Sequence, residues 1–488
     1  YARVTGKPGV TTAASGPGTL NLLTGIYTAA IDCAPMVILG GAGPVHEIGR
    51  EAFQEVDQQS IIDPMVKWSH RTTQAARYPE VVSMAFREAV NGRPGPVYID
   101  CGADVLYEEV EEDEAISGTR ATRRTRPVAE PGAIKEVIDM MSAAERPIIF
   151  AGGGAFFSGS APELERFVDV TKTPFYTAPM SRGLVPEDNA VSFQGARSTA
   201  MREADFVLVV GTRLNWMMQY GQRFAQDAKI VQIDIDGREL GHNRNIDLGI
   251  QADAKAAMGQ LLAEAEAREG EFADRLESDW VIHLREDNDR RAEQSAPLLN
   301  SDAQPIHPLR LCKEIREFLD RDAIVSVDGN EILHFGRQSI PTNVPGHRLN
   351  SGVTGTMGVG LPYGIGAQLA KPDAQVLVLH GDGSMGQNAM EIDTAVRHNL
   401  PVVTVISNNA GWTARTPGQR KPGRELGFTA YHKMAESLGA YGEEVTDPAE
   451  IKPALDRAYS SGKAAVINVI VEPTAAGVSR AWGGSRME

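Results

Sequence analysis

The chain has 488 residues, of which 42% are hydrophobic and 23% charged, as is usual for a globular protein of two to four domains. Its formal net charge of −16 argues against nucleic acid as the main partner, and its apolar runs are too short to predict a membrane segment. The three cysteines, Cys33, Cys101 and Cys312, lack metal-ligand spacing and no secretory signal is visible, which predicts reduced thiols and a cytoplasmic protein.

Short apolar runs alternate with amphipathic stretches along the chain, a pattern that predicts βαβ units and parallel sheets. The expected buried strands, in chain order, are Met36–Leu39, Val97–Asp100, Pro147–Phe150, Phe206–Val210, Ile230–Ile235, Ala323–Val327, Val376–Leu379, Val402–Ile406 and Ala465–Val471. Helical periodicity is clearest in Pro308–Leu319 and Met390–His398. We therefore predict an α/β fold of three doubly wound parallel-sheet domains.

Two polar stretches predict the boundaries of these domains. Residues 107–126 carry an acidic run and then a basic run without apolar periodicity, as expected for an exposed linker. Residues 264–303 form a polar helical stretch, after which a new domain is expected to start. The predicted domains are 1–110, 130–265 and 300–488. Because the chain opens at Tyr1 in what reads as a helix end, we expect a true N-terminus upstream of it.

A glycine-flanked aspartate follows one of the expected strands. Gly381-Asp382-Gly383-Ser384 stands at the carboxyl end of Val376–Leu379, where open α/β sheets bind ligands. A helix expected from Met385 to His398 would direct its first N–H groups at an anion. One strand–helix–strand unit later the chain reads Asn408-Asn409, so the side chains of Asp382 and Asn409 are expected to meet. Carboxylate, amide and carbonyl oxygens are the hard ligands that Mg²⁺ prefers.

This Gly-Asp-Gly and Asn-Asn pair resembles the signature of the thiamine-diphosphate enzymes. The resemblance implies thiamine diphosphate and Mg²⁺ as cofactors, with Asp382, Asn409 and the carbonyl of Gly411 as metal ligands. The segment from Thr354 resembles the family segment whose bulky apolar residue, here Met357, wedges under the cofactor and bends it, which aids catalysis. The cofactor-binding residues implied in this part of the chain are Gly329, Asn330, Met357, Gly381, Asp382, Gly383, Ser384, Asn409, Gly411 and Trp412.

The first segment resembles the pyrimidine-binding domain of the acetolactate synthase-like group. Its Ser-Gly-Pro-Gly turn implies Pro17, Gly18 and Asn21 as cofactor contacts, while Phe53 and the catalytic candidate Gln54 would face the substrate. In that group the cofactor lies at a subunit interface, so the resemblance implies a homodimer or tetramer. The family glutamate that activates the cofactor is expected upstream of Tyr1. The pair His46-Glu47 is interpreted as surface.

The middle segment resembles the branch that contains 2-hydroxyacyl-CoA lyase and oxalyl-CoA decarboxylase, through residues 196–205 and the string Arg213-Leu-Asn-Trp216. The resemblance implies a lyase that cleaves a 2-hydroxyacyl-CoA thioester to formyl-CoA and an aldehyde or ketone. Arg197 and Arg213, near strand ends or helix starts, could meet the phosphates of coenzyme A, and Asp234 could accept from a ribose hydroxyl. An arginine in such a place is also often a surface ion pair.

A basic loop, 413–424, follows the second half of the cofactor motif in this acidic protein. Its cations are Arg415, Arg420, Lys421 and Arg424, and its Pro-Gly pairs predict a mobile lid over phosphates or thioester. Glu425 is a candidate catalytic acid–base or the partner of a neighbouring arginine.

The motifs depart from the lyase branch, which commonly has Gly-Asp-Ser and three asparagines followed by Tyr, where this chain has Asn-Asn-Ala-Gly-Trp412. The acyl substrate therefore stays open. The alternatives are acetolactate synthase, which usually carries FAD, oxalyl-CoA decarboxylase, and a non-catalytic scaffold.

Overall fold

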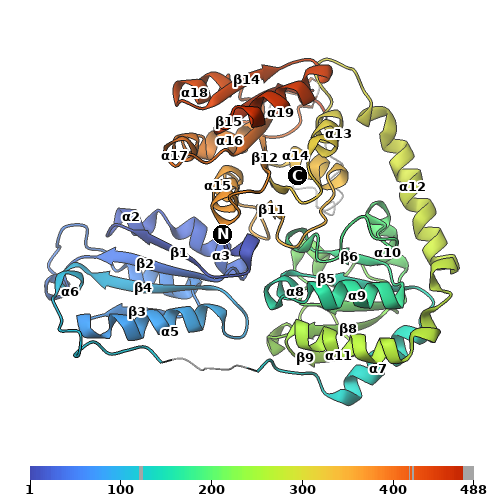
Figure 1. Ribbon diagram of the computed structural model, residues 1–488, viewed down its shortest axis with the longest axis horizontal. Helices are drawn as coiled ribbons and strands as arrows, with labels where there is room; N and C mark the ends of the chain where they lie inside the picture. Colours follow the sequence, from blue (N-terminus) through green and yellow to red (C-terminus); the bar gives the residue numbers. More distant parts are fainter. Residues whose placement is uncertain (120–124, 417, 420–421, 476–488) are drawn as a thin grey trace. The chain divides into compact units, whose positions relative to one another are not determined.

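The computed structural model describes residues 1–119, 125–416, 418–419 and 422–475, and it contains three parallel sheets (Figure 1). Their strand orders are β1-β2-β4-β3, β6-β5-β7-β8-β9 and β11-β10-β12-β13-β15-β14. The predicted α/β class with three parallel sheets is confirmed. The chain divides into two compact units, one of Tyr1–Arg126 with Gly352–Thr356, the other of Pro127–Ser351 with the chain from Met357 onward.

The first unit is built on the four-stranded sheet. Helix α5 repeats Val81, Ala85 and Ala89 at intervals of four, so one face of the helix packs on Val37 and Val97 of the sheet. The opposite face of the sheet packs against α3 and α4. The elements are α1 Ala2–Thr5, β1 Gly9–Ala13, α2 Pro17–Leu20, α3 Leu23–Ile31, β2 Met36–Ala42, α4 Gln58–Ile62, β3 Ser69–Thr72, α5 Tyr78–Val90, β4 Pro96–Gly102 and α6 Ala103–Tyr107.

The second unit begins with the five-stranded sheet. Its central strands are buried on both faces, which explains their continuous apolar sequences. The elements are α7 Pro131–Ala143, β5 Pro147–Ala151, α8 Gly153–Ser158, α9 Ala161–Thr171, β6 Phe175–Thr177, α10 Arg197–Glu203, β7 Phe206–Val210, β8 Lys229–Asp234, β9 Leu248–Gln251, α11 Ala254–Ala267 and α12 Asp279–Leu299. The long helix α12 leads from this sheet toward the next (Figure 1).

The six-stranded sheet completes the second unit. Apolar residues of α13, α14 and α19 cover one face of it and form its core. The elements are α13 Pro308–Phe318, β10 Ile324–Asp328, α14 Glu331–Ser339, β11 Arg348–Asn350, α15 Gly360–Ala370, β12 Val376–Gly381, α16 Asp382–Asn388, α17 Glu391–Arg397, β13 Val403–Asn408, α18 Tyr431–Ser437, β14 Tyr441–Val445, α19 Ile451–Ser460 and β15 Ala465–Ile470.

One predicted helix is wrong in its extent. Instead of a single helix from Met385 to His398, α16 starts at Asp382 itself and ends at Asn388, and α17 follows from Glu391. At the break the hydrogen bonds span three residues instead of four, from Ile392 N to Ala389 O and from Asp393 N to Met390 O.

All nine predicted strands occur, and residues 108–119 and 125–126 contain no helix or strand. The three cysteines are free thiols. Within the described part of the chain, no helix is both long and apolar enough to cross a bilayer.

Candidate functional site

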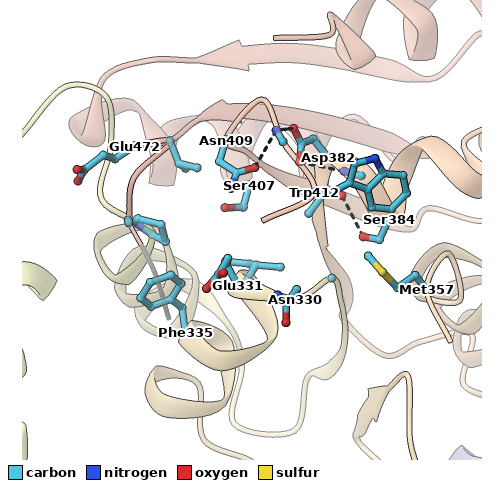
Figure 2. Close-up of a pocket in the computed structure, with 18 residues that line it drawn as sticks. Asn330, Glu331, Phe335, Met357, Asp382, Ser384, Ser407, Asn409, Trp412 and Glu472 are labelled. Atoms are coloured by element: carbon cyan, nitrogen blue, oxygen red, sulfur yellow. Dashed lines mark hydrogen bonds between the residues drawn. The ribbon is translucent and has the colours of Figure 1, made fainter. Parts of the chain in front are cut away.

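An open cavity with about 400 Å³ of space, part of it continuous with solvent, lies at the carboxyl ends of β10, β12 and β13 (Figure 2). Parallel strands in register bring the loops that follow them to the same sheet edge, which is why segments far apart in sequence meet here. The lining residues are Pro308, Gly329, Asn330, Glu331, Ile332, Phe335, Met357, Gly381, Asp382, Gly383, Ser384, Ser407, Asn409, Gly411, Trp412, Val471, Glu472 and Ala475. Every cofactor-binding residue predicted for this part of the chain is among them.

The three candidate metal ligands lie together. Gly381 pairs with Ser407 across neighbouring strands, so Asp382 and Asn409 follow at adjacent strand ends. The N–H of Gly411 donates to Asp382 Oδ2 at 2.8 Å and to Asn409 Oδ1 at 3.2 Å. Figure 2 shows both side chains converging on this one group. The predicted meeting of Asp382 and Asn409 is therefore observed.

The loop that carries Gly411 is held in one conformation. Ala410 has a φ of 58°, a left-handed conformation that is unfavourable for a residue with a side chain. Its N–H donates to Asn408 Oδ1 at 3.2 Å, and the amide of Asn408 donates in turn to Asn468 Oδ1 at 3.1 Å. Tyr431 donates from its hydroxyl to the carbonyl of Asp382 at 3.0 Å. These contacts fix the positions of the candidate ligands before any metal binds.

The chemistry of the cavity fits a divalent cation with a diphosphate. Burial raises the pKa of Asp382 to about 6, and the N–H groups of Gly383 and Gly411 offset part of the rise. The described lining contains no lysine or arginine. A bound diphosphate would add negative charge to the same place, so a cation is required. The donors at hand are a carboxylate, an amide oxygen and a carbonyl, which suit Mg²⁺. Among the described residues, no three His, Cys, Asp or Glu side chains gather in a group that could hold a metal ion.

Trp412 forms one wall of the cavity. A Cβ on Gly383 would stand 2.7 Å from Cε3 of the indole, so the glycine is needed for the ring to lie where it does. Ser384 was expected to touch the cofactor, but its hydroxyl is bonded within the protein, to the carbonyls of Asp328 and Gly381 at 3.0 Å each. That leaves the backbone of Ser384 to meet a ligand.

Comparison with known proteins places this site in a family. Models of the thiamine pyrophosphate enzymes match the chain in three parts: the N-terminal TPP binding domain over residues 1–61, the central domain over 134–261 and the C-terminal TPP binding domain over 333–469. The chain belongs to the thiamine pyrophosphate enzymes. It is therefore an enzyme whose cofactor is thiamine diphosphate.

The relatives within this family have three different activities. The chain is 33% identical over 500 residues to 2-hydroxyacyl-CoA lyase of Arabidopsis thaliana, covering 97% of this chain and 86% of that protein. It is 33% identical over 500 residues to a probable acetolactate synthase large subunit of Methanocaldococcus jannaschii, covering 98% and 83%. It is 31% identical over 485 residues to oxalyl-CoA decarboxylase of Escherichia coli, covering 97% and 85%. Overall similarity leaves the substrate open.

In this thiamine pyrophosphate enzyme, the two ends of the basic loop 413–424 are hydrogen-bonded to each other beside the candidate metal site. Gly411 pairs with Glu425 as an antiparallel bridge, and Trp412 N donates to the carbonyl of Arg424 at 3.0 Å. Glu425 is exposed and is not among the described residues that line the cavity, so its catalytic role stays a prediction. Arg415 donates to the carbonyl of Ala410 at 3.0 Å. Arg420 and Lys421 lie outside the described residues, and a moving lid stays a prediction too.

The first unit presents its predicted cofactor turn next to Gln54. Gly16, before Pro17, has a φ of 58°, and a Cβ there would stand 2.6 Å from the carbonyl of Gln54. Ser15 Oγ donates to Gln54 Oε1 at 2.7 Å, so the turn and this side chain are joined. Phe53 is 85% exposed. Gly18 lies within α2 and Asn21 ends it.

His46 and Glu47 lie on the surface of the same unit, as expected. The imidazole of His46 bonds Asp104 Oδ2 at 2.9 Å.

Sequence reasoning found one member of a cluster of three arginines and missed the other two. Arg197 begins α10, and its guanidinium lies over the ring of Phe150 at 4.9 Å. Burial, together with the positive charges of Arg337 and Arg223, lowers the pKa of Arg197 to about 9. Its Nε is buried without a hydrogen-bond partner. Within the described chain neither Arg197 nor Arg337 forms an ion pair. We call Arg197, Arg223 and Arg337 the arginine cluster.

Two further residues predicted to bind coenzyme A lie at strand ends of the five-stranded sheet. Arg213 follows β7 and is partly exposed. Asp234 ends β8 as expected, and its Oδ1 already accepts from the N–H of Asp236 at 2.9 Å. Within the segment Arg213–Trp216, Leu214 is buried, and Asn215 caps the next turn by accepting from Met217 N at 3.0 Å. These two residues therefore have structural roles.

Proposed function

We propose that this thiamine-diphosphate enzyme is a lyase that cleaves a 2-hydroxyacyl-CoA to formyl-CoA and an aldehyde or ketone. The reaction breaks the bond between the thioester carbonyl and the hydroxyl-bearing carbon. The hydroxyl-bearing carbon becomes the new carbonyl, and the thioester carbon takes up a proton. Bound thiamine diphosphate supplies the electron sink for this cleavage.

The residues that would hold the cofactor belong to the cavity at the end of β12. Asp382, Asn409 and the carbonyl of Gly411 would bind Mg²⁺, and the metal would offset the diphosphate. Gly329, Asn330 and the backbone of residues 381–384 would surround the phosphates. Met357 would press on the cofactor from below and keep it bent, and Trp412 would close the cavity on the opposite side.

The arginine cluster is the observation that supports a coenzyme A thioester as the substrate. Three guanidinium groups lie near one another. Burial lowers the pKa values of Arg197 and Arg337, and the positive charge of neighbouring arginines lowers them further. In a protein with a net charge of −16, such a group is costly unless an anion compensates it. Arginine binds phosphates well because its planar fork matches their oxygens. The phosphates of an acyl-CoA are ligands of this kind.

The charge of the cavity favours a hydroxyacyl group over an oxalyl or 2-oxo acid group. Glu331 and Glu472 line the cavity together with Asp382, and the described lining contains no lysine or arginine. A second carboxylate beside the reacting carbon would meet like charge there. A neutral hydroxyl next to a thioester would not. This argument supports the lyase over the decarboxylase and the synthase.

The first unit would complete the active site of another subunit in a homodimer or tetramer. Its turn at Pro17 and Gly18, together with Gln54 and Asn21, would reach the partner's cofactor. The cytoplasmic location stays a prediction from the sequence.

The test is product analysis with the complete protein. Purified enzyme with thiamine diphosphate and Mg²⁺ is incubated with 2-hydroxyacyl-CoA esters of several chain lengths, and formyl-CoA and the aldehyde or ketone are measured together. The proposal expects equal amounts of both products from at least one ester, and none from the Asp382→Ala variant. Failure to form formyl-CoA from any ester would refute it. Release of CO₂ from oxalyl-CoA, or a flavin spectrum with acetolactate formation from pyruvate, would identify the two alternatives.

A further inference from the structure

The segment that carries Met357 is held from beneath by side chains that do not line the cavity. Helix α15 starts three residues after Met357 and has no side-chain cap of its own. Its first N–H groups are instead bound by residues of the sheet: Gly360 N donates to Asp328 Oδ2 at 2.8 Å, and Leu361 N donates to His380 Nε2 at 3.0 Å. From α16, the amide of Asn388 donates to the carbonyl of Gly358 at 2.8 Å.

Asp328 is the centre of this arrangement. It ends β10, is fully buried, and directly precedes Gly329 of the cavity wall. Burial raises the pKa of its carboxyl to about 6, and the N–H groups of Gly360, Gly358, Gly329 and Val359 offset part of the rise. The carboxyl therefore interacts with the backbone of two loops, the one that follows Met357 and the one expected to touch the diphosphate.

A closed ring of hydrogen bonds joins Asp328 to the third loop, residues 381–384. Because His380 Nε2 accepts from Leu361, the proton of the neutral ring is on Nδ1, which faces Ser384 Oγ at 2.9 Å. Ser384 Oγ donates in turn to the carbonyl of Asp328 at 3.0 Å. Side chains in such a buried network have little freedom to shift independently.

The start of α15 packs tightly against the residues of this ring. A Cβ on Gly360 would stand 2.7 Å from His380 Nε2 and 2.8 Å from Asp328 Cβ. The start of α15 therefore lies as close to the strand ends as a backbone can, and the length of the carboxyl group at 328 sets its distance from the sheet. Since Met357 is three residues away in a segment also held at Gly358, its height above the sheet follows from that distance.

We propose that Asp328 is a positioning residue that fixes Met357 relative to the diphosphate loop, with Asn388 holding the same segment from the other side. The inference rests on the proposed role of Met357 in bending the cofactor. Asp328 itself does not touch the cofactor, and its effect passes through Met357.

The test is a double-mutant cycle in the holoenzyme with Met357→Ala, Asp328→Ala, which removes the accepting oxygen, and the double variant. The rate at which the acidic thiazolium proton of the bound cofactor exchanges with deuterium is followed by quenched-flow NMR. The dissociation constant of thiamine diphosphate in Mg²⁺ is measured separately from tryptophan fluorescence. Ser326→Ala is the matched control, because Ser326 lies in the same strand, is fully buried, and has a hydroxyl without a hydrogen-bond partner among the described residues.

Both single variants are expected to slow the exchange by about ten- to hundredfold, the cost of a misplacement near 1 Å. The double variant is expected to be no slower than Met357→Ala, and Ser326→Ala to match wild type. A wild-type rate in Asp328→Ala, or effects of the two substitutions that multiply, overturns the inference and leaves the role of Met357 intact. A wild-type rate in Met357→Ala overturns both. If Asp328→Ala does not fold, Asn388→Ala decides: a slower exchange supports the inference, and a wild-type rate overturns it.

Discussion

Replacing Gly383 by alanine should force the indole of Trp412 out of its place in the cavity wall. The new methyl would stand 2.7 Å from Cε3, 3.0 Å from Cδ2 and 3.1 Å from Cζ3, whereas ordinary contacts begin at 3.4 Å. The ring must therefore retreat by about 0.7 Å. Gly383 lies in α16 without a positive φ, so the backbone itself accepts alanine and the effect is purely one of contact.

The expected size follows from two opposing terms. Overpacking a well-filled site costs about 1–3 kcal/mol, and a rigid ring belongs to the upper half of that range. The better helix propensity of alanine returns up to about 1 kcal/mol. We expect Gly383→Ala to lower the free energy of unfolding by about 1–2 kcal/mol. Because the ring moves within the cofactor cavity, the dissociation constant of thiamine diphosphate should rise by about tenfold or more, as for a binding loss of 1.4 kcal/mol.

Urea unfolding and calorimetric titration with thiamine diphosphate and Mg²⁺ measure the two effects. Gly259→Ala in α11 is the control for helix propensity, since a methyl there meets nothing within 4 Å, and it should stabilise the protein slightly. In a Trp412→Val background the cost of Gly383→Ala should vanish. The reasoning is refuted if the substitution costs the same free energy in both backgrounds, because the indole would then not be the obstacle.

Three further predictions follow from the site. Asp382→Asn and Asn409→Ala should each abolish the Mg²⁺ dependence of cofactor binding and raise the dissociation constant of thiamine diphosphate at least about tenfold. If a variant keeps the full Mg²⁺ dependence in calorimetric titration, the substituted residue is not a metal ligand. The raised pKa of Asp328, about 6 against an ordinary 3.8, means that the folded protein holds this proton more tightly than the unfolded chain. Its contribution to stability is complete below about pH 4 and declines by roughly 3 kcal/mol as the pH rises through 6. The difference in unfolding free energy between wild type and Asp328→Asn, measured by urea titration, should therefore change over that pH range. A difference that stays constant would show that the carboxyl titrates normally. Arg197→Met should raise the KM for the acyl-CoA about ten- to hundredfold, as expected when a charged hydrogen bond is lost. The melting temperature of the free protein should stay equal or rise, because repulsion from Arg337 and Arg223 is relieved. An unchanged KM would exclude Arg197 from the substrate site.

The sequence alone predicted the interior of each sheet but not its edges. The nine strands expected from apolar runs are β2 and β4, β5, β7 and β8, and β10, β12, β13 and β15, all of them interior strands. The six that were missed, β1, β3, β6, β9, β11 and β14, are the two edges of each sheet. An interior strand is covered on both faces and reads as a continuous apolar run. An edge strand such as Ser69–Thr72 is partly exposed and carries no such signal.

The cofactor site follows the same division. Spacing along the chain was enough to bring Asp382 and Asn409 together, because a single βαβ unit places its two strand ends side by side. The arginine cluster and the role of Asp328 required the tertiary structure. Arg197 and Arg337 come from α10 and α14 and Arg223 from the loop before β8, and Asp328 binds an N–H group 32 residues away in sequence. A motif encodes contacts within one supersecondary unit. Contacts between different supersecondary units depend on how their surfaces pack, and a local sequence pattern does not predict that packing.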